Sequence, residues 1–404
     1  MRIGIIGAGA SGLMAAYAAS EKEGSEVLLF DKNPMPGKKL LRTGNGRCNF
    51  LNKVQDVTCF NSSNPERVKE TLSNISSENL LSVLLDMGIV PTLDHDDYYY
   101  PMSDQAKGVV KCMTGAVRAR GVRILGGKEI SSVRSEDGGF VLVTDGYEYR
   151  VDRVIVCCGG LAAPDTGCDG SGYRIMSGFG HKVTDTYPAL SPLIIADDLL
   201  KKAAGTRVSA QITYGFYSCD GELQITDYGI SGIAVFQLSR HIAKDLASGK
   251  TCKVHIRFFP EYPDEGLGDI VTWLLCRENI TIEERLAGLI PEKLCSVLLD
   301  RIGLDGSQKG QVTEDDYKNL LDLLLDYEIT IEKVRGFDKC QVTAGGVSLM
   351  DIDPDTMESN ICPGLYACGE LLDVDGICGG YNLQWAFTTG LLAGISAANE
   401  NIQN

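Results

Sequence analysis

Residues 1–32 read MRIGIIGAGASGLMAAYAASEKEGSEVLLFDK, and this stretch decides the fold of the chain. The apolar residues 3–6 predict a short buried strand, the alanine-rich residues 13–19 predict a helix, and residues 27–30 predict a second strand. A G-x-G-x-x-G sequence, residues 7–12, separates the first strand from the helix. We therefore expect a β-α-β unit that opens a doubly wound α/β sheet of parallel strands.

The glycine positions favour dinucleotide binding. Gly7 permits a tight turn, Gly9 lets the backbone approach a pyrophosphate, and Gly12 lets the helix pack closely on the strand. The helix N-terminus adds free N–H groups and partial positive charge. Asp31 follows Gly12 by 19 residues, where a carboxylate can accept hydrogen bonds from an adenosine ribose. A signal peptide is excluded because the glycines interrupt the apolar run.

Composition narrows the class of protein. The 404 residues leave room for two or three domains. The chain has 54 acidic and 38 basic residues, and the resulting net charge of −16 argues against a nucleic-acid partner. No apolar run is long enough to span a bilayer and no lipidation signal occurs, so we expect a cytoplasmic protein without a membrane partner. The 14 cysteines lack a C-x-x-C pair, and His95, His181, His241 and His255 lack ligand spacing, so no metal is expected.

The segments after the opening unit alternate in character. The loop of residues 34–52 carries four basic residues, which suits an anionic ligand, although a solvated basic loop is the alternative. Residues 65–88 and 105–120 have helical periodicity, and the tyrosine-rich residues 94–103 between them predict a loop that could line a pocket. Residues 122–157 predict a small antiparallel layer followed by a buried parallel strand.

The middle of the chain predicts an insertion of roughly 150 residues, about one domain's worth. Residues 208–258 alternate between apolar and polar, as in a half-buried antiparallel sheet, and residues 267–331 have helical periodicity. The nucleotide-binding sheet is then completed by residues 341–398, which contain a strand, a glycine-rich loop and a helix of small residues.

The C-terminal segment indicates which dinucleotide is bound. FAD is long, so a second element must hold its ribityl chain and the pyrimidine end of its ring. Gly369 and Glu370 can bind ribityl hydroxyls, and the helix that begins near Asn382 can direct its positive end toward the flavin N1 and C2 carbonyl. The glycine-rich loop has a defined role only with a flavin, so we expect FAD.

At these motifs the chain resembles the YhiN/BaiN-like bacterial flavoproteins, a family of NAD(P)/FAD-dependent oxidoreductases that also carries an aminoacetone-oxidase label. The resemblance runs nearly end to end and rests on residues 7–12, 43–49, 335–347 and 364–382, with Thr43 and Asn45 as small departures. It implies a FAD-binding Rossmann domain of the glutathione-reductase type over residues 1–187, an inserted β domain over 188–264, a helical domain over 265–334, and completion of the FAD domain by 335–404.

One group of that family is linked to reducing unsaturated bile-acid ketones. We therefore expect hydride transfer from reduced FAD to an electron-poor, enone-like small molecule. NAD(P)H would be a transient donor, because only one nucleotide fingerprint exists. Alternatives are an amine oxidase using dioxygen and a non-enzymatic flavin sensor or RNA-modification accessory. A disulfide reductase is disfavoured for two reasons. The position five residues after Cys48, where a second redox cysteine would be needed, is occupied by Lys53, and Cys157 and Cys158 belong to a buried strand.

Candidate site residues follow from the loops that should face the flavin. For proton transfer or substrate contact these are Arg47, Tyr100, Asp375 and Tyr381, each with a plain structural alternative, and Ser231 with Gly232 could border the substrate cavity. The residues that we expect to contact the cofactor are Gly7, Ala8, Gly9, Ala10, Ser11, Gly12, Asp31, Lys32, Lys39, Leu40, Gly46, Arg47, Cys48, Asn49, Ile130, Cys158, Gly159, Gly160, Gly369, Glu370, Asn382, Leu383, Gln384 and Ala386.

Overall fold

The computed structural model describes residues 1–94 and 97–399, so His95, which entered the argument against a metal site, lies outside the described residues. The chain divides into two compact units. An outer unit comprises Met1–Tyr187 and Val342–Asn404, and an inserted unit comprises Pro188–Gln341. The chain passes between them at β12 (Tyr187–Ala189) and β19 (Val342–Ala344).

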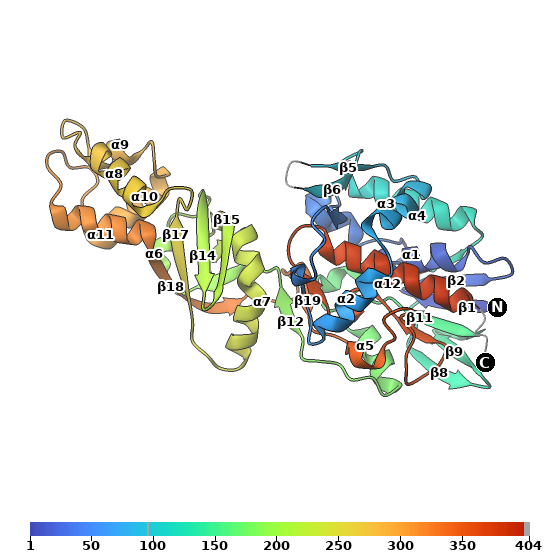
Figure 1. Ribbon diagram of the computed structural model, residues 1–404. Helices are drawn as coiled ribbons and strands as arrows, with labels where there is room; N and C mark the ends of the chain where they lie inside the picture. Colours follow the sequence, from blue (N-terminus) through green and yellow to red (C-terminus); the bar gives the residue numbers. More distant parts are fainter. Residues whose placement is uncertain (95–96, 400–404) are drawn as a thin grey trace. The chain divides into compact units, whose positions relative to one another are not determined.

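The outer unit is built on a five-stranded parallel sheet (Figure 1). Its strands, in spatial order, are β20 (Leu365–Ala367), β11 (Arg153–Val156), β1 (Arg2–Ile6), β2 (Glu26–Asp31) and β7 (Arg123–Gly126). The central strand β1 is nearly all apolar because both faces of the sheet are covered. The predicted doubly wound α/β architecture, with its opening β-α-β unit, is confirmed.

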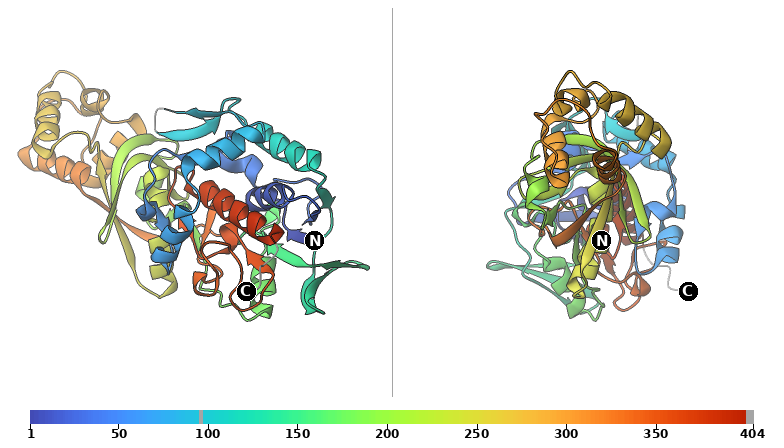
Figure 2. Two further views of the ribbon diagram at one scale, coloured as in Figure 1. Left: turned by 45° about the vertical axis from the view of Figure 1, so that its right-hand side comes forward. Right: turned by 90° about the vertical axis from the view of Figure 1, so that its left-hand side faces the viewer.

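Glycines let two helices of this unit pack at backbone distance. The helices of the unit are α1 (Ala10–Ala19), α2 (Pro65–Ser73), α3 (Ser77–Asp86), α4 (Ala106–Ala119), α5 (Ser171–Gly178) and α12 (Tyr381–Ala398). Figures 1 and 2 show α12 beside α1. A Cβ atom on Gly390 would lie 2.4 Å from the Ser11 carbonyl oxygen, and one on Gly394 would lie 2.4 Å from that of Ala15. These two glycines therefore set the close approach of the first and last helices.

Short antiparallel strands surround the sheet. They are β8 (Ser132–Glu136), β9 (Gly139–Thr144) and β10 (Tyr147–Val151) in one layer, β3 (Leu51–Asn52), β5 (Pro91–Leu93) and β6 (Tyr98–Pro101) in a second, and β4 (Phe60–Asn61) with β21 (Asp375–Gly376) in a third. The predicted antiparallel layer is confirmed for residues 132–151, whereas residues 123–126 form β7 at the edge of the parallel sheet. The loop predicted over 94–103 is wrong in part, because residues 98–101 form β6 between β3 and β5. The helix predicted over 65–88 is broken into α2 and α3.

The inserted unit is a closed barrel of six antiparallel strands with helices. Its strands, in spatial order, are β13 (Leu193–Ile195), β16 (Gly229–Ser231), β15 (Tyr217–Ile225), β14 (Arg207–Tyr214), β17 (Cys252–Phe258) and β18 (Tyr327–Val334). Helical periodicity was expected as far as residue 331, but Tyr327, Ile329 and Ile331 alternate inward in β18, which pairs with β13 and β17. The structure therefore differs from the predicted division into a β domain over 188–264 and a helical domain over 265–334, because β18 closes the barrel.

Helices complete the inserted unit: α6 (Asp198–Lys201), α7 (Ile233–Ala247), α8 (Asp264–Leu275), α9 (Ile282–Leu286), α10 (Glu292–Ile302) and α11 (Glu314–Leu325). Single 3₁₀ turns lie at Val57–Cys59, Pro164–Thr166, Leu349–Asp351 and Gly369–Leu371, and a kinked 3₁₀ segment lies at Leu40–Gly46. Within residues 1–94 and 97–399, no helix combines the length and the apolar character that crossing a membrane requires.

Arg285 is a buried cation that ties the helical part together. Its side chain is 1 % exposed and donates hydrogen bonds to the carbonyls of Ile280 (3.0 Å), Leu275 (2.9 Å) and Gly310 (2.7 Å). Leu275 is the last residue of α8, so the guanidinium meets the negative end of that helix. Three separate segments depend on this one side chain.

Arg285→Met is expected to lower the free energy of unfolding by about 2–4 kcal/mol, because one buried and two partly buried carbonyls lose their donor. Urea denaturation measures the change. Arg207→Met is the matched control, since the Arg207 side chain is 61 % exposed and pairs only with Glu222 at the surface, so its effect should stay within about 0.5 kcal/mol. Equal effects of the two substitutions would contradict the interpretation.

His181 gives the outer unit a stability that depends on pH. The imidazole is 4 % exposed, and its Nε2 atom lies 2.7 Å from the Ser359 hydroxyl, while Nδ1 has no partner among the described residues. Burial lowers the pKa of His181 below its usual value, against a smaller opposing effect of Asp351. The unfolded chain therefore binds this proton more readily than the folded one.

The stability that neutral His181 contributes is complete above pH about 6.5 and is lost as the pH falls below that value. Thermal unfolding followed from pH 7.5 to about 5 should be less steeply pH-dependent in His181→Gln than in the parent chain. An unchanged slope in His181→Gln would exclude His181 as the titrating group.

Candidate dinucleotide-binding site

The glycines of the loop at the end of β1 have two different roles. Two of them allow close packing, and one leaves room for a ligand. Gly7 has φ +103°, and a Cβ atom there would lie 2.3 Å from the Cys157 carbonyl oxygen. A Cβ atom on Gly12 would lie 1.8 Å from the Gly7 carbonyl oxygen. On Gly9, in contrast, a Cβ atom would meet no protein atom within 4 Å, and its φ of −81° suits any residue. The fold requires Gly7 and Gly12, whereas Gly9 leaves room for something that is not protein.

The N-termini of α1 and α12, like those of α2, α4 and α5, lack side-chain caps. Gly9 is the N-cap of α1 and Gly380 is the N-cap of α12, and neither helix has a capping side-chain hydrogen bond. Their first backbone N–H groups therefore remain available to an anionic or carbonyl ligand, and the helix dipoles add positive potential there. Pyrophosphate and flavin carbonyl groups both meet this requirement.

Asp31 ends β2 and is held in place by backbone donors. Its Oδ2 atom accepts a hydrogen bond of 2.7 Å from the Ala8 N–H, and its Oδ1 atom accepts bonds from the Asn33 N–H (2.7 Å) and Asn33 Nδ2 (3.0 Å). Oδ1 thus accepts two hydrogen bonds, whereas Oδ2 accepts one and keeps a second lone pair for a hydroxyl. The structure thus fixes the carboxylate beside the glycine loop, where the sequence predicted ribose contact.

The neighbours of Asp31 include two other expected cofactor residues. The Lys32 ammonium lies 2.7 Å from the Asp169 carboxylate. Burial disfavours ionisation of Asp169, but the Lys32 charge and hydrogen bonds from Ser171 outweigh it and lower its pKa to about 2. Ile130 is buried at 5 % exposure, just after Lys128, whose N–H donates to the Asp31 carbonyl at 2.9 Å. Lys32 is therefore engaged by protein, while Ile130 forms an apolar wall near Asp31.

The loop after β2 is shaped by a run of left-handed residues. Gly44, Asn45, Gly46 and Cys48 have φ values of 55°, 54°, 86° and 66°. Ala10, at the start of α1, is half-buried, and Leu40, which begins the loop's 3₁₀ turn, is buried at 2 % exposure. The loop is thus anchored by Leu40 and Cys48, but its Arg42 and Arg47 side chains are 55 % and 42 % exposed, as in the solvated basic loop that was the alternative.

An ion pair joins this loop to the C-terminal part of the outer unit. The Lys39 ammonium contacts the Glu370 carboxylate, whose other oxygen accepts a hydrogen bond of 2.9 Å from the Thr343 N–H. The Thr343 hydroxyl in turn accepts from the N–H groups of Leu161 (2.8 Å) and Ala162 (3.0 Å). Four chain segments thus meet at Glu370, which was expected to bind ribityl hydroxyls.

The loop after β11 is closed by glycines. Gly159 has φ +70°, and a Cβ atom on Gly160 would lie 2.5 Å from the Thr343 hydroxyl oxygen. Beside it, the Tyr173 hydroxyl is buried without a partner among the described residues. Burial, together with the charge of Glu370, raises the pKa of Tyr173 well above its usual value. Thr343 and Tyr173 were missed: Thr343 lies in a motif that supported the family resemblance, but nothing in the sequence distinguishes Tyr173.

The first turn of α12 presents amide side chains. Asn382 makes a bidentate pair with the backbone of Gly376 at 2.8 Å in both directions, and the Gln384 amide contacts Gln55. Leu383 packs against the core and Ala386 is buried. Asn382 therefore orders the glycine-rich loop, a role that the sequence did not predict.

Arg47 and Tyr100 form one cluster. The Arg47 guanidinium lies 4.0 Å from the centre of the Tyr100 ring and is bound by Asp94 (3.2 Å) and Asp104 (2.5 Å). The hydrogen bonds that the guanidinium donates to Asp104 and to Asp94 raise the pKa of Arg47. The geometry brings these two candidates together, and the carboxylates already neutralise the arginine that was expected to reach a phosphate.

Asp375 and Tyr381 are both buried, at 2 % and 3 % exposure. Asn61 Nδ2 lies 3.3 Å from an Asp375 carboxylate oxygen, and the Tyr381 hydroxyl donates to the Val54 carbonyl at 3.2 Å. Burial raises the pKa of Tyr381 above its usual value. Tyr381 therefore has the plain structural role that was its alternative, because its hydroxyl is hydrogen-bonded to the protein backbone.

Ser231 and Gly232 belong to the inserted unit. Ser231 is the last residue of β16 and is 8 % exposed. A Cβ atom on Gly232 would lie 2.1 Å from the Glu222 carbonyl oxygen, so this glycine serves packing between strands. A role at a substrate cavity remains a prediction for both residues.

Burial raises the pKa of three cysteines of the outer unit that lie near the glycine loops. Burial raises the pKa of Cys48 to about 11 and that of Cys158 to about 12, and it raises the pKa of Cys157 well above its usual value. Cys157 and Cys368 have sulfur atoms 3.1 Å apart, both as free thiols. Dithiol chemistry requires a thiolate, so this environment disfavours it. In the part of the chain that the structure describes, no cluster of metal-ligating side chains occurs.

The residues present fit FAD. Besides the open space at Gly9 and the uncapped N-termini of α1 and α12, three buried polar atoms in this region lack a partner among the described residues: Asn49 Oδ1, Tyr173 Oη and Gln384 Oε1. A buried polar atom without a partner costs free energy, so these atoms indicate a ligand rich in hydroxyl and amide groups. The ribityl chain and the pyrimidine ring of a flavin have that chemistry.

One protein family, two relatives and one solved structure resemble this chain. A family described as "HI0933-like protein Rossmann domain" matches residues 1–396. A "3-dehydro-bile acid delta(4,6)-reductase" of Clostridium scindens is 40% identical over 405 residues, covering 98% of this chain and 99% of that protein. A "ribosomal RNA dihydrouridine synthase" of Haemophilus influenzae is 31% identical over 407 residues, covering 98% of both. The fold matches a solved 3-ketosteroid delta1-dehydrogenase from Sterolibacterium denitrificans with a TM-score of 0.54 and 12% identity, covering 98% of this chain and 99% of that one.

Gly9→Ala and Gly12→Ala are expected to fail in different ways. Gly9→Ala should leave the unfolding midpoint of the apoprotein unchanged, because its Cβ atom meets no protein, yet it should weaken FAD binding at least tenfold by occupying ligand space. Gly12→Ala should lower the unfolding midpoint of the apoprotein. Thermal unfolding and flavin titration measure the two effects. Wild-type FAD affinity in a folded Gly9→Ala variant would contradict the assignment.

Proposed function

Since this chain belongs to the HI0933-like Rossmann family and is an oxidoreductase of the flavoprotein type, we propose that it reduces a carbon–carbon double bond conjugated to a carbonyl group. The substrate class that we propose is a small, electron-poor enone. FAD is the cofactor, and NAD(P)H is the electron donor.

The observation that carries the proposal is the chemistry shared by two relatives of different substrate class. The delta(4,6) double bonds of a 3-dehydro bile acid are conjugated to a ketone. The bond that is saturated when uridine becomes dihydrouridine is conjugated to the uracil C4 carbonyl. In both reactions a hydride adds to the carbon remote from the carbonyl group and a proton adds to its neighbour. The higher identity, 40% against 31%, favours a small steroid-like enone over RNA.

The outer unit provides the groups that would hold the cofactor. Gly9 and the α1 N-terminus would receive the pyrophosphate, and Asp31 would accept from the adenosine ribose. Glu370 would contact ribityl hydroxyls while Lys39 and the Thr343 N–H keep it oriented. FAD, when bound, supplies the hydride. The uncapped α12 N-terminus would stabilise negative charge on the pyrimidine end of the ring, which favours the reduced form.

The donor follows from the single nucleotide fingerprint. One G-x-G-x-x-G sequence occurs in the chain, at residues 7–12, and FAD occupies it in this proposal. NAD(P)H would therefore bind transiently, deliver its hydride and leave before the enone enters. NAD(P)H and the enone would bind at the same site, one after the other.

Anaerobic stopped-flow spectroscopy tests this function in two half-reactions. NADH or NADPH should bleach the flavin absorbance, and a 3-keto-4,6-diene steroid should restore it with formation of the product saturated at one double bond. The matched control is the corresponding saturated 3-ketone, which lacks the conjugated bond and should leave the flavin reduced. Failure of reoxidation by every conjugated ketone supplied, after successful reduction, would contradict the enone assignment.

RNA reduction is the second candidate, because the Haemophilus influenzae relative covers 98% of the chain. The net charge of −16 disfavours it, since binding to a phosphate backbone relies on clustered basic residues. Incubating the reduced protein with unmodified ribosomal RNA distinguishes the two functions. A mass increase of two hydrogens on a uridine, without turnover of the steroid, would favour RNA. Peroxide formed from amines in air would instead indicate an amine oxidase.

A further inference from the structure

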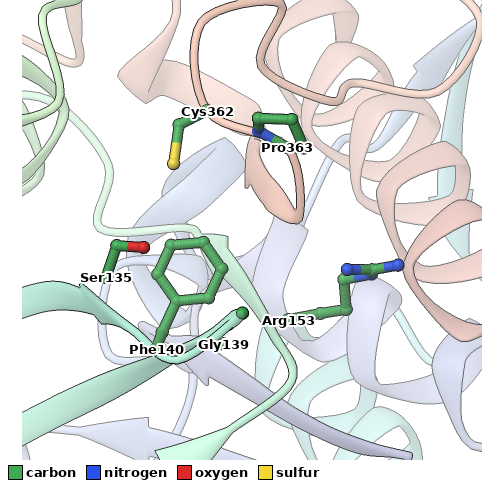
Figure 3. Close-up of a pocket in the computed structure, with 7 residues that line it drawn as sticks. Ser135, Gly139, Phe140, Arg153, Cys362 and Pro363 are labelled. Atoms are coloured by element: carbon green, nitrogen blue, oxygen red, sulfur yellow. The ribbon is translucent and has the colours of Figure 1, made fainter.

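A pocket of about 390 Å³ lies in the outer unit, away from the glycine loop. It is lined by Ser135, Gly138, Gly139, Phe140, Arg153, Cys362 and Pro363 (Figure 3). Arg153 is the first residue of β11, and Cys362 and Pro363 precede β20, so the pocket lies at the amino edge of the parallel sheet. The glycine loop follows the carboxyl end of β1, so the two sites are on opposite edges.

Arg153 carries a charge that the surrounding protein does not pair. Its Nε atom is buried without a hydrogen-bond partner among the described residues, and none of the ion pairs found among those residues includes its guanidinium. The nearby Glu358 carboxylate accepts instead from the Gly364 N–H at 2.7 Å. In a chain with 54 acidic residues, a half-buried guanidinium without an acidic partner is a receptor for an anion.

The rest of the pocket suits a flat apolar body. Phe140 is 4 % exposed and presents its ring beside Gly364, where a Cβ atom would lie 3.2 Å from Phe140 Cε2 and 3.0 Å from an Arg153 terminal nitrogen. Burial raises the pKa of the Cys362 thiol, so this wall adds no negative charge. Figure 3 shows Ser135 with its hydroxyl directed toward the Phe140 ring.

We propose that this pocket binds a small aromatic carboxylate, with the carboxylate on Arg153 and the ring over Phe140. The site is separate from the dinucleotide site and does not depend on the reaction proposed above. The guanidinium supplies a charged donor, the Ser135 hydroxyl supplies a neutral one, and Phe140 buries the ring. A carboxylate accepts hydrogen bonds from the terminal nitrogens of Arg153 more strongly than a neutral ligand does.

The experiment titrates benzoate into the FAD-saturated full chain by isothermal calorimetry and ligand-observed NMR. Benzoate should bind saturably, benzamide at least tenfold more weakly, and inorganic phosphate weakly because it lacks a ring. Arg153→Gln should weaken benzoate binding at least tenfold. The flavin absorbance spectrum should not change on binding, because the pocket lies at the other edge of the sheet.

A second variant covers the case in which Arg153→Gln does not fold. Ser135 is exposed on β8, so Ser135→Trp should fold normally and block the pocket, again with at least a tenfold loss. Ser132→Trp, on an exposed position of the same strand that does not line the pocket, is the matched control and should bind as the parent does. Unchanged benzoate affinity in Ser135→Trp, equal affinity for benzamide, or a benzoate-induced flavin spectrum would overturn the proposal.

Discussion

Contact between backbones at glycine is the constraint on which the outer unit depends. The turn after β1 fits between the end of β11 and the start of α1 only because Gly7 and Gly12 lack side chains. The same condition recurs where α12 crosses α1 at Gly390 and Gly394. Two helices and a sheet thereby approach closely enough for both helix N-termini to serve one ligand. A well-packed protein interior has no room for an extra methyl group at such contacts.

Polar contacts hold the segments of the site after glycine has brought them together. Glu370 receives Lys39 from the N-terminal loop and the Thr343 N–H from the strand that returns from the inserted unit. Asn382 holds the backbone of the glycine-rich loop before α12 begins. Residues separated by more than 300 positions therefore order one another. This arrangement is preorganised, so a bound cofactor would not need to order these segments itself.

Local patterns in the sequence predicted the parts of this structure that depend on neighbouring residues. The strand, glycine turn and helix of residues 1–32 depend on apolar runs and turn chemistry within a few residues, and the structure confirms them. The same reasoning failed for residues 327–331, because a strand whose partners lie far away in the chain, in β13 and β17, has no local signal that separates it from a helix. Residues 98–101 were misassigned for the same reason, since β3 and β5 make them a strand.

Glycine spacing, apolar periodicity and charge are local properties, so the nucleotide-binding fold, the family and the acidic character of the chain follow from the order of its residues. Which of the predicted groups are available depends on the folded chain. Arg47 is neutralised by Asp94 and Asp104, Tyr381 is used in packing, and Arg153 is left with an unpartnered Nε atom. Whether a charge or hydroxyl is free depends on which residues the fold brings within about 4 Å of it, and that distance is unrelated to separation along the chain.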